Sequence, residues 1–547
     1  MRQIDQKTTE LFGVPSPTLM ENAATAVART VAELTGAADE PILVLCGPGN
    51  NGGDGAAAAR LLAQSGAQVD VVLIGKIDDT KGDARTNFVK AKTPDKDVSL
   101  SFFECASVDE WSSLQLNELA KAYTLVIDAL FGTGLTRPLE GIYRDAVSYL
   151  LQLRRPDDED PGRRPAIVSI DIPSGLNADS AEPIGIAVQS DLTVSMTSPK
   201  PANVLPPAAN YNGDLIVADI GSPAELIEKA GARLFLSEEA DARNWLIKTR
   251  YANDSYKNSH GHVLVVAGSR GFTGAAALCG NAAMRSGAGL VTVGTPASAQ
   301  PTVASQVMPE VMTAALAETD RGTVSDEALG HVLELAERAN VIALGPGLSS
   351  EEAQTRDFVR KLVEQRSTPM VVDADGLNCV APWPAELRGA TDFPVILTPH
   401  PGEMLRLIGS NNKSAIADRV TVAREFAVAH ELIVVLKGTR PLIAAPDGRV
   451  FINPTGNPGL GTAGAGDTLT GVIAGFLAQA YGTLKHQAVA LDAVIAALYI
   501  SGLAGDLAAE EIGMRSLVAS DIRDHLRAAI CALDPEGEMP WPNHTTA

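Results

Sequence analysis

Cysteine and histidine are both scarce in this 547-residue sequence, and the two shortages limit its chemistry. The five cysteines are scattered and form no C-x-x-C pair, which argues against a zinc site and predicts reduced thiols in a cytoplasmic protein. No histidine precedes His260, so proton transfer in the first half must use a carboxylate, Lys200, a tyrosine or water. Aromatic residues make up only 4%, whereas the 49 glycines and many alanines are typical of α/β proteins.

Positive charge is also in short supply. Lys and Arg number 44 against 66 Asp and Glu, which gives a net charge of −22 and argues against nucleic-acid binding. The N-terminal segment MRQIDQKTTELF has acidic residues and no apolar run, so we expect no signal peptide. Asp492 interrupts the most apolar stretch, 490–505, which favours a buried helix over a membrane span. Anionic ligands must therefore be held by backbone N–H groups or a few cationic side chains.

Short apolar segments alternate with amphipathic stretches in two series. Between them, residues 222–250 carry charges and no strong strand. This pattern predicts two α/β domains, at 1–222 and 235–535, each with a largely parallel sheet covered by helices on both faces. The charged segment 154–165 is predicted to be a solvated loop. Strands are predicted at 41–46, 69–75, 123–129 and 166–172 in the first series, and at 262–268, 290–294, 341–347, 369–375, 394–400 and 432–438 in the second.

The segment GPGNNGGDG at 47–55 lies between a predicted strand and an alanine-rich helix. Its glycines leave backbone N–H groups free to face an anion, although a Gly-rich turn is by itself common. Asp128 and Asp171 stand at the ends of two other strands, and strand ends border the ligand crevice of an open α/β sheet. We therefore expect Asn51, Asp128 and Asp171 to converge on one crevice. The alternative is that each Asp only caps a turn.

The sharpest motif of the second half is NPGLGTAGAGDTLTGVIAGF at 457–476, a Gly-rich loop that runs into a helix. The helix N-terminus offers N–H groups and partial positive charge to a phosphoryl group. Asp467 stands beside it, where a carboxylate can accept the proton of an attacking hydroxyl. A first-turn Asp that merely favours the helix dipole is the alternative. His400, Glu403 and Lys437 follow two other strands and are further candidates for ligand contact.

Five motifs of the first half, namely LMENAA (19–24), GPGNNGGDG, VIDALFGTGL, DIPSGLN and SDLTVSMTSPKP (190–201), together resemble the NAD(P)H-hydrate epimerase family, also called the YjeF N-terminal family. The resemblance implies a Rossmann-like doubly wound sheet, interconversion of R and S forms of NADH hydrate and NADPH hydrate, and potassium held by Asn51, Asp128 and Ser174. With no histidine in this half, Asp171 is our candidate for proton transfer. The implied substrate contacts are Asn50, Asn51, Gly52, Gly53, Asp54, Gly132, Thr133, Gly134, Leu135, Thr136, Arg137, Pro138 and Asp171.

The second half resembles the ADP/ATP-dependent NAD(P)H-hydrate dehydratase family, the YjeF C-terminal family, which has a ribokinase-like fold. The motifs are GSRGFTGAAAL, RSGAGLVTV, MPEVM, GPGL, DADGLN, LTPHPGEM and the GAGD segment. Many relatives read K-G-x-x-T where this chain has Pro441, which lacks an N–H donor. The resemblance implies substrate contacts at Ala275, Gly347, His400 and Asp467, and nucleotide contacts at Lys437, Gly438, Thr439, Arg440, Pro441 and Gly466.

Both halves therefore point to the same damaged cofactor. The expected chemistry is epimerisation of the hydrate, followed by dehydration of the S form in which Asp467 activates the C6 hydroxyl toward ADP or ATP, with Mg²⁺ as counter-ion. One alternative is a small-molecule kinase, for example for a vitamin precursor. Such a kinase would use the same GAGD segment for phosphoryl transfer, but this function would not explain the first half. Another is a first half that only binds ligand. A homo-oligomer is an open alternative, because the sequence does not fix the number of subunits.

Overall fold

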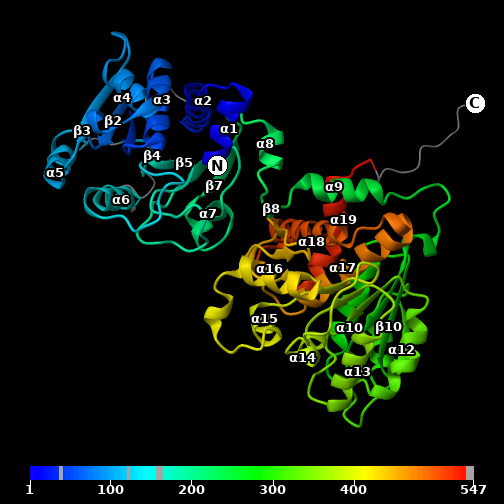
Figure 1. The fold of residues 1–547 in the computed structure, drawn as a ribbon. Helices are drawn as coiled ribbons and strands as arrows, with labels where there is room; N and C mark the ends of the chain where they lie inside the picture. Colours follow the sequence, from blue (N-terminus) through cyan, green and yellow to red (C-terminus); the bar gives the residue numbers. More distant parts are fainter. Residues whose placement is uncertain (36–40, 120–122, 155–163, 537–547) are drawn as a thin grey trace, which may run out of the picture. The chain divides into compact units, whose positions relative to one another are not determined.

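The computed structural model describes residues 1–35, 41–119, 123–154 and 164–536. The chain forms two compact units, Met1–Ala232 and Arg233–Ala547 (Figure 1). Each unit is built around one sheet, and both are α/β folds, which confirms the predicted fold class. The predicted loop at 154–165 lies almost entirely outside the described residues.

Seven parallel strands form the sheet of the first unit, in the order β3-β2-β1-β4-β5-β6-β7. The order reverses between β1 and β4, which are neighbours in the sheet. This is a doubly wound, Rossmann-like arrangement, whose ligand crevice lies at the carboxyl ends of the two strands that flank the reversal. The strands are β1 (Pro41–Cys46), β2 (Gln68–Ile74), β3 (Leu100–Cys105), β4 (Leu125–Ala129), β5 (Ala166–Ile170), β6 (Leu192–Met196) and β7 (Asp214–Ala218).

The helices of the first unit are α1 (Arg2–Phe12), α2 (Ser16–Thr35), α3 (Asn50–Gln64), α4 (Gly82–Lys92), α5 (Val108–Asn117), α6 (Gly141–Leu153), α7 (Pro201–Val204) and α8 (Ala224–Glu228). They cover both faces of the sheet, because successive strand side chains point to opposite sides. Ile42 and Val44 of β1 share a core with α2, α3 and α4. Leu43 and Leu45 share the opposite core with α5 and α6. The helices thereby hold the strand ends, and the loops that follow them, in fixed positions.

Ten strands form the sheet of the second unit, in the order β11-β10-β9-β12-β13-β14-β15-β16-β17-β8. The pairs from β11 to β15 are parallel, β16 is antiparallel to both its neighbours, and β8 pairs in parallel with β17. The strand order reverses between β9 and β12. The strands are β8 (Leu234–Leu236), β9 (His262–Val266), β10 (Leu290–Pro296), β11 (Met312–Leu316), β12 (Val341–Leu344), β13 (Met370–Val372), β14 (Val395–Leu397), β15 (Ile433–Leu436), β16 (Leu442–Ala444) and β17 (Val450–Ile452).

The expectation that 222–250 carries no strong strand is wrong in one respect, because β8 lies within it. Three residues long, β8 gains its stability from pairing with β17 and from stacking of Phe235 on Phe451, with ring centroids 5.2 Å apart. Its partner β17 lies more than two hundred residues further along the chain, so a local sequence pattern does not predict β8. The edge of the second sheet is therefore closed by a segment that joins the two units in sequence.

The helices of the second unit are α9 (Glu239–Lys248), α10 (Thr273–Arg285), α11 (Gln300–Gln306), α12 (Leu329–Ala336), α13 (Ala353–Glu364), α14 (Asp375–Val380), α15 (Pro401–Leu407), α16 (Arg419–His430), α17 (Ala465–Gln479), α18 (Ala490–Ile512) and α19 (Ala519–Leu533). The helix α18 is long and apolar enough to cross a membrane by length and composition, but 72% of its most apolar window is buried inside the unit. It packs against α17 and α19, as expected for a core helix.

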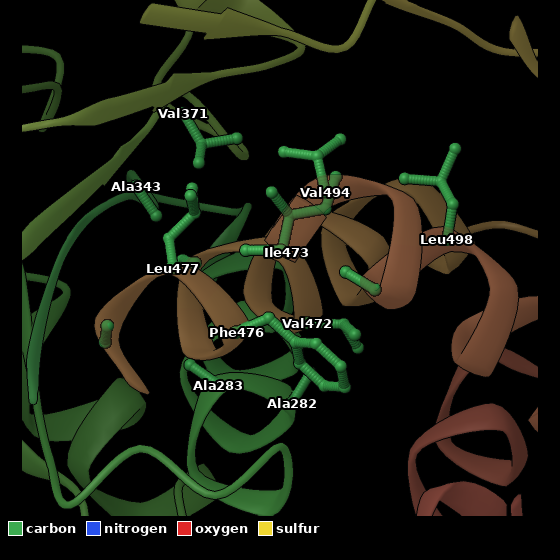
Figure 2. Close-up of a cluster of buried hydrophobic side chains, with 14 of the residues drawn as sticks. Ala282, Ala283, Ala343, Val371, Val472, Ile473, Phe476, Leu477, Val494 and Leu498 are labelled. Carbon is green, nitrogen blue, oxygen red and sulfur yellow. The ribbon is translucent and has the colours of Figure 1, made fainter. Parts of the chain in front are cut away.

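Helix α17 lies at the centre of the second unit's core. Figure 2 shows its Ile473 and Leu477 among side chains of the sheet and α18, with Phe476 against the alanines of α10. The approach of α10 is close, because a Cβ on Gly471 would lie 2.2 Å from the carbonyl oxygen of Cys279. Residues 470–479 are all buried. The core therefore fixes α17 firmly, and with it the position of the helix N-terminus that carries Asp467.

Two candidate active sites

In the first unit, the loop after β1 reaches the point where the strand order reverses. Gly49 is the N-cap of α3, and no side chain caps this helix start, so its first N–H groups face outward to a ligand. Glycine is required by close packing: a Cβ on Gly47 would lie 1.9 Å from the carbonyl oxygen of Leu130, and one on Gly52 would lie 1.8 Å from that of Gly47. The turn therefore holds the start of α3 directly against the end of β4.

A cavity of about 480 Å³ opens beside this turn. Asn51 and Asp171 meet in its wall at Gly132, where a Cβ would lie 3.0 Å from Asn51 Oδ1 and 3.2 Å from Asp171 Oδ2. Helices α1 and α2 also contribute residues to the wall. The polar residues of the wall are Asp5, Ser16, Asn50, Asn51, Asp54, Thr133, Asp171, Thr197 and Lys200.

Asp171 and Lys200 form a buried ion pair in this cavity. Asp171 directly follows β5 and has φ +70°, a left-handed conformation that aspartate tolerates better than most residues. The side chain of Lys200 is only 5% exposed, and its Nζ donates to Asp171 Oδ1, to Ser195 Oγ at 3.0 Å and to the Met196 carbonyl at 2.9 Å. With all three N–H donors satisfied, the lysine is held rigidly and fixes the Asp171 carboxylate toward the cavity.

Asp128 lies within β4 and does not line the cavity, so the expected convergence of Asn51, Asp128 and Asp171 is only partly correct. It is fully buried. Its oxygens accept hydrogen bonds from Ser174 Oγ (2.6 Å), Ser174 N (2.9 Å) and Ser169 Oγ (2.7 Å). Burial raises the pKa of Asp128, and these hydrogen bonds oppose that rise. Ser174 Oγ also accepts from Phe131 N at 2.8 Å, so Asp128 anchors the start of the loop after β4.

Some residues of the loop 132–138 line the cavity, and others pack against the rest of the first unit. Gly132, Thr133 and Gly134 line the cavity, whereas Leu135 packs into the hydrophobic core and has only its backbone to offer a ligand. Thr136 lines a second, neighbouring hollow of about 490 Å³ that shares Thr133, Gly134 and Lys200 with the first. Arg137 is exposed, and Pro138 packs beside Gly185. Gly52 and Gly53 are buried within α3, where they allow close helix packing.

In the second unit, three Gly-rich turns come from β9, β12 and the start of α17. The amide of Gly268, just after β9, donates to the Pro346 carbonyl at 2.8 Å. A Cβ on Gly347 would lie 3.0 Å from Ala275 Cβ, so these two predicted contacts adjoin each other. Gly464, with φ +84°, is the N-cap of α17 and has no capping side chain. The strand order reverses between β9 and β12, so this site occupies the position that ligand sites take in open α/β sheets.

Asp373 organises the charged residues at the start of α17. It directly follows β13, is 1% exposed, and accepts 2.7 Å hydrogen bonds from Lys437 Nζ and Thr470 Oγ1. Glu403 Oε2 lies 3.9 Å from the same lysine nitrogen. A Cβ on Gly466 would lie 3.4 Å from Lys437 Nζ. The amine of Lys437 is therefore held over the first turn of α17, beside Asp467.

Two carboxyl groups of this cluster, those of Asp467 and Glu403, have pKa values raised toward neutral pH. Burial, and then repulsion from Asp373, raise the pKa of Asp467 to about 6, although Lys437 opposes the rise. Burial and Asp373 likewise raise the pKa of Glu403 to about 7, again against Lys437. Burial lowers the pKa of Lys437, but Asp373, Glu403 and Asp467 outweigh it, so the net shift is upward. Asp467 can thus be ionised at neutral pH and still be basic enough to accept a proton.

His400 serves first as a helix cap. Its Nδ1 accepts hydrogen bonds from the amides of Gly402 (3.0 Å) and Glu403 (3.3 Å), and its own amide donates to Glu403 Oε2 at 2.8 Å. Nε2, which therefore carries the hydrogen, lies 3.4 Å from Glu403 Oε1. Burial and then Lys437 lower the pKa of His400, so the ring is neutral at pH 7. Half of the ring remains exposed to a ligand.

Arg419 braces the predicted nucleotide loop 437–441 from behind. Its guanidinium donates to the carbonyls of Thr439 (2.8 Å), Leu436 (3.3 Å) and Lys437 (3.3 Å). The Arg440 side chain donates to the Pro454 carbonyl, and the Pro441 carbonyl accepts from Asn453 N at 2.9 Å. The carbonyls of Lys437, Thr439 and Pro441 are thus held by other parts of the protein.

Sequence reasoning did not single out Asp5, Asp373, Thr470 or Arg419 as site residues. Asp373 stands at a strand end in the quoted motif DADGLN, which is the signal that pointed to Asp128 and Asp171. Thr470 lies one helical turn after Gly466 and was visible only as part of the helix. Asp5 reaches its site from a helix distant in sequence, and Arg419 reaches the loop 437–441 from the start of the preceding helix α16; no local pattern predicts either contact.

Comparisons with known proteins agree with this two-site architecture. Residues 16–202 match the family described as YjeF-related protein N-terminus, and residues 263–527 match NAD(P)H-hydrate dehydratase. The bifunctional NAD(P)H-hydrate repair enzyme of Moorella thermoacetica is 39% identical, over 98% of this chain and 97% of that protein. Its counterpart from Thermofilum pendens is 37% identical, over 100% and 98%.

Among solved structures, the ADP/ATP-dependent NAD(P)H-hydrate dehydratase from Bacillus subtilis, co-crystallised with ATP and Mg²⁺, is 30% identical. It covers 55% of this chain and 98% of its own, with a TM-score of 0.47. Both family matches lie in this one chain, and the relatives that are 39% and 37% identical align with nearly all of it. The chain therefore belongs to the family of bifunctional NAD(P)H-hydrate repair enzymes.

Proposed function

We propose that this chain restores hydrated NADH and NADPH in two steps. The epimerase domain, residues 1–222, interconverts the R and S hydrates, and the dehydratase domain, residues 235–535, converts the S hydrate to the reduced cofactor with ADP or ATP. The observation that carries the proposal is the chain's membership in a bifunctional family together with two separate sites, each at the strand-order reversal of its own sheet. The five unpaired cysteines support a cytoplasmic setting.

In the dehydratase site, the hydrate carries a hydroxyl on C6 of its ring. Asp467 accepts the hydroxyl proton while the oxygen attacks the terminal phosphorus of the nucleotide, and the bridging P–O bond breaks to release AMP from ADP, or ADP from ATP. The N-terminus of α17 and the amine of Lys437 stabilise the negative charge on the transferred phosphoryl group. The C6–O bond then breaks with loss of phosphate and of a C5 proton, which restores the ring double bond.

Epimerisation inverts C6 of the hydrate, so a bond at this carbon must break and form again on the other face of the ring. Either the C6–O bond breaks, or the ring opens and closes again. Asp171 faces the cavity and is held by Lys200, so it is our candidate to move the hydroxyl proton. The first N–H groups of α3, together with the loop 132–138, are proposed to hold the dinucleotide phosphates. Of the substrate contacts implied by the resemblance, Asn50, Asn51, Asp54 and Asp171 line this same cavity.

Two ions are part of the proposal. Potassium fits beside Asp128, a fully buried carboxylate among hydroxyl and carbonyl oxygens, with Ser174 and Asn51 as further ligands. When bound, it neutralises Asp128 and fixes the loops that hold phosphate. For Mg²⁺, the described residues contain no group of three or more His, Cys, Asp or Glu side chains placed to hold a metal. We therefore propose that Mg²⁺ binds with the nucleotide, and we assign it no residue.

The decisive experiment follows the absorbance of restored dihydronicotinamide when purified protein receives NADH hydrate with ADP, with ATP, or with no nucleotide. We expect restoration only with nucleotide, and one inorganic phosphate released per cofactor restored. A small-molecule kinase would instead leave its phosphate on a stable product. Absence of restoration with both nucleotides would overturn the dehydratase assignment.

The separation of the two sites gives a first prediction. Cut near residue 230, the second unit should consume the S hydrate at its full rate and the R hydrate only as fast as it epimerises spontaneously. Each unit has its own sheet and core, so the cut removes one site and spares the other. Chromatographic separation of the two hydrates during the reaction measures both rates. Rapid use of both epimers by the cut protein would contradict the division of labour.

The raised pKa of Asp467 gives a second prediction. Because this carboxylate must be ionised to accept a proton, and its pKa is about 6, dehydration should slow as the pH falls through about 6. Below that point the rate should fall roughly tenfold per pH unit, as expected for one required ionised base. A pH profile of kcat/KM for the hydrate, which reports the pKa of the ligand-free enzyme, measures the effect, and correction for spontaneous hydrate decay in acid is the control. A profile that is flat through pH 6 would remove Asp467 from this role.

A further inference from the structure

Asp5, on α1, brings an unused acceptor to the cavity of the first unit. It lines the cavity, and its Oδ1 is buried with no hydrogen-bond partner among the described residues. Buried polar atoms are nearly always paired, because an unpaired one loses its hydration for nothing in return. The other carboxylate of the same helix, Glu10, is exposed and accepts a 2.7 Å hydrogen bond from Gln6. The unpaired oxygen of Asp5 therefore requires a different explanation.

A second unpaired polar atom lines the same cavity. Asn51 Nδ2 is buried and has no hydrogen-bond partner within the described residues. Its other amide atom, Oδ1, is the one that faces Gly132, and it remains available for the potassium site proposed above. The Asp171 carboxylate, by contrast, is already paired with Lys200. The cavity thus presents one spare acceptor and one spare donor, as a ligand site does before the ligand binds.

The charges around Asp5 narrow the chemistry of that ligand. Asp54 and Asp171 face the same region, and burial and then Asp171 raise the pKa of Asp54 well above its ordinary value. Burial also raises the pKa of Asp5, against the pull of the Met1 amino group and Lys200. An anionic group such as phosphate would be repelled here. A neutral group with both an N–H donor and a C=O acceptor matches the spare pair, and a primary carboxamide has both.

We propose that Asp5 is a further substrate-binding residue of the epimerase site, and that its free carboxylate oxygen accepts a hydrogen bond from the carboxamide NH₂ of the hydrated nicotinamide ring while the Asn51 amide donates to the carboxamide oxygen. This rests on the proposed function of the first unit. It orients the substrate: the ring lies toward α1 and Asp171, and the phosphates lie toward the N-terminus of α3. The same orientation brings C6 of the ring to the Asp171–Lys200 pair.

The test compares two substrates that differ only in the carboxamide: NADH hydrate, and the hydrate of the 3-acetylpyridine analogue, in which a methyl group replaces NH₂. In the unmodified chain the KM for epimerisation should be about tenfold lower for the carboxamide, as one charge-assisted hydrogen bond predicts. Asp5→Ala should raise the KM for NADH hydrate by a similar factor and leave the analogue within about twofold, so that the preference disappears. Asp5→Asn keeps an acceptor oxygen, so this variant should retain part of the preference for the carboxamide substrate.

Glu10→Gln, on the same helix, is the matched control and should change neither KM. The dehydratase activity of the same chain reports whether each variant folds. If the unmodified chain epimerises neither hydrate, the proposed function of this unit fails. If it epimerises both, and Asp5→Ala keeps the full preference for the carboxamide, the function stands and the assignment of Asp5 is overturned.

Discussion

Replacing Asp467 by Asn should lower the rate of dehydration by about a hundredfold to ten-thousandfold, the usual loss when a general base is removed. Asn keeps the size of the side chain but cannot accept the hydroxyl proton. The binding of nucleotide should change little, because Lys437 is held by Asp373 and Glu403 and the loop 437–441 is braced by Arg419. Single-turnover restoration of NADH measures the first effect, and calorimetric titration with ADP or ATP measures the second.

The matched control is Asp357→Asn, because Asp357 is exposed on α13. It should behave as the unmodified chain does. Epimerisation by the first unit should also survive in the Asp467 variant, which separates a lost base from a damaged fold. If Asp467→Asn restored NADH at near-normal rates, another group would have to accept the proton. The geometry then points to Glu403, the other carboxylate of the cluster with a raised pKa.

Local pattern predicted the architecture well, because buried parallel strands leave a strong signature. All ten predicted strands exist; β1 matches its predicted bounds, and the ends of the others differ by at most three residues. Strands β3, β6 and β7 were not predicted, because their apolar runs are short or interrupted, as in LSFFEC at 100–105. The short strands β16 and β17 are stable only as part of the second sheet. These strands owe their existence to pairing partners, and the partners are invisible in a local window.

The sites divide in the same way. Asn51, Asp171 and Asp467 follow strands or begin helices, so the topology of an α/β sheet places them by rule. Asp128 shows the limit of that rule: one residue before the end of β4, it points into the fold and bonds Ser169 and Ser174. Asp373 directly follows β13 and obeys the same rule, whereas Asp5 and Arg419 join their sites through tertiary packing. Their contribution depends on distances between elements, which sequence spacing alone does not supply.

Replacing Asp171 by Asn should slow epimerisation about a hundredfold at saturating substrate, with little change in KM, because it removes the group that moves a proton. Asn is the right choice at this position, since φ is +70° and Asn tolerates the left-handed region better than Ala. The variant leaves Lys200 buried without its ionic partner, and circular dichroism must show that the unit still folds. Exchange between the two hydrates, observed by NMR, measures the rate.

Asp128 should affect the same reaction for a different reason. Asp128→Asn keeps the size of the side chain and one of its two acceptor oxygens, so it retains only part of the Ser169 and Ser174 hydrogen bonds, and it removes the negative charge proposed to hold potassium. We expect a KM about tenfold higher, a modest change in kcat, and loss of the potassium dependence that the unmodified chain should show. The Asp128 variant thus tests substrate binding, and the Asp171 variant tests turnover. For both, exchange between the two hydrates is recorded in potassium and in sodium. If Asp171→Asn kept full exchange at saturation, its proton-moving role would pass to Lys200. If Asp128→Asn still responded to potassium, the ion would bind elsewhere.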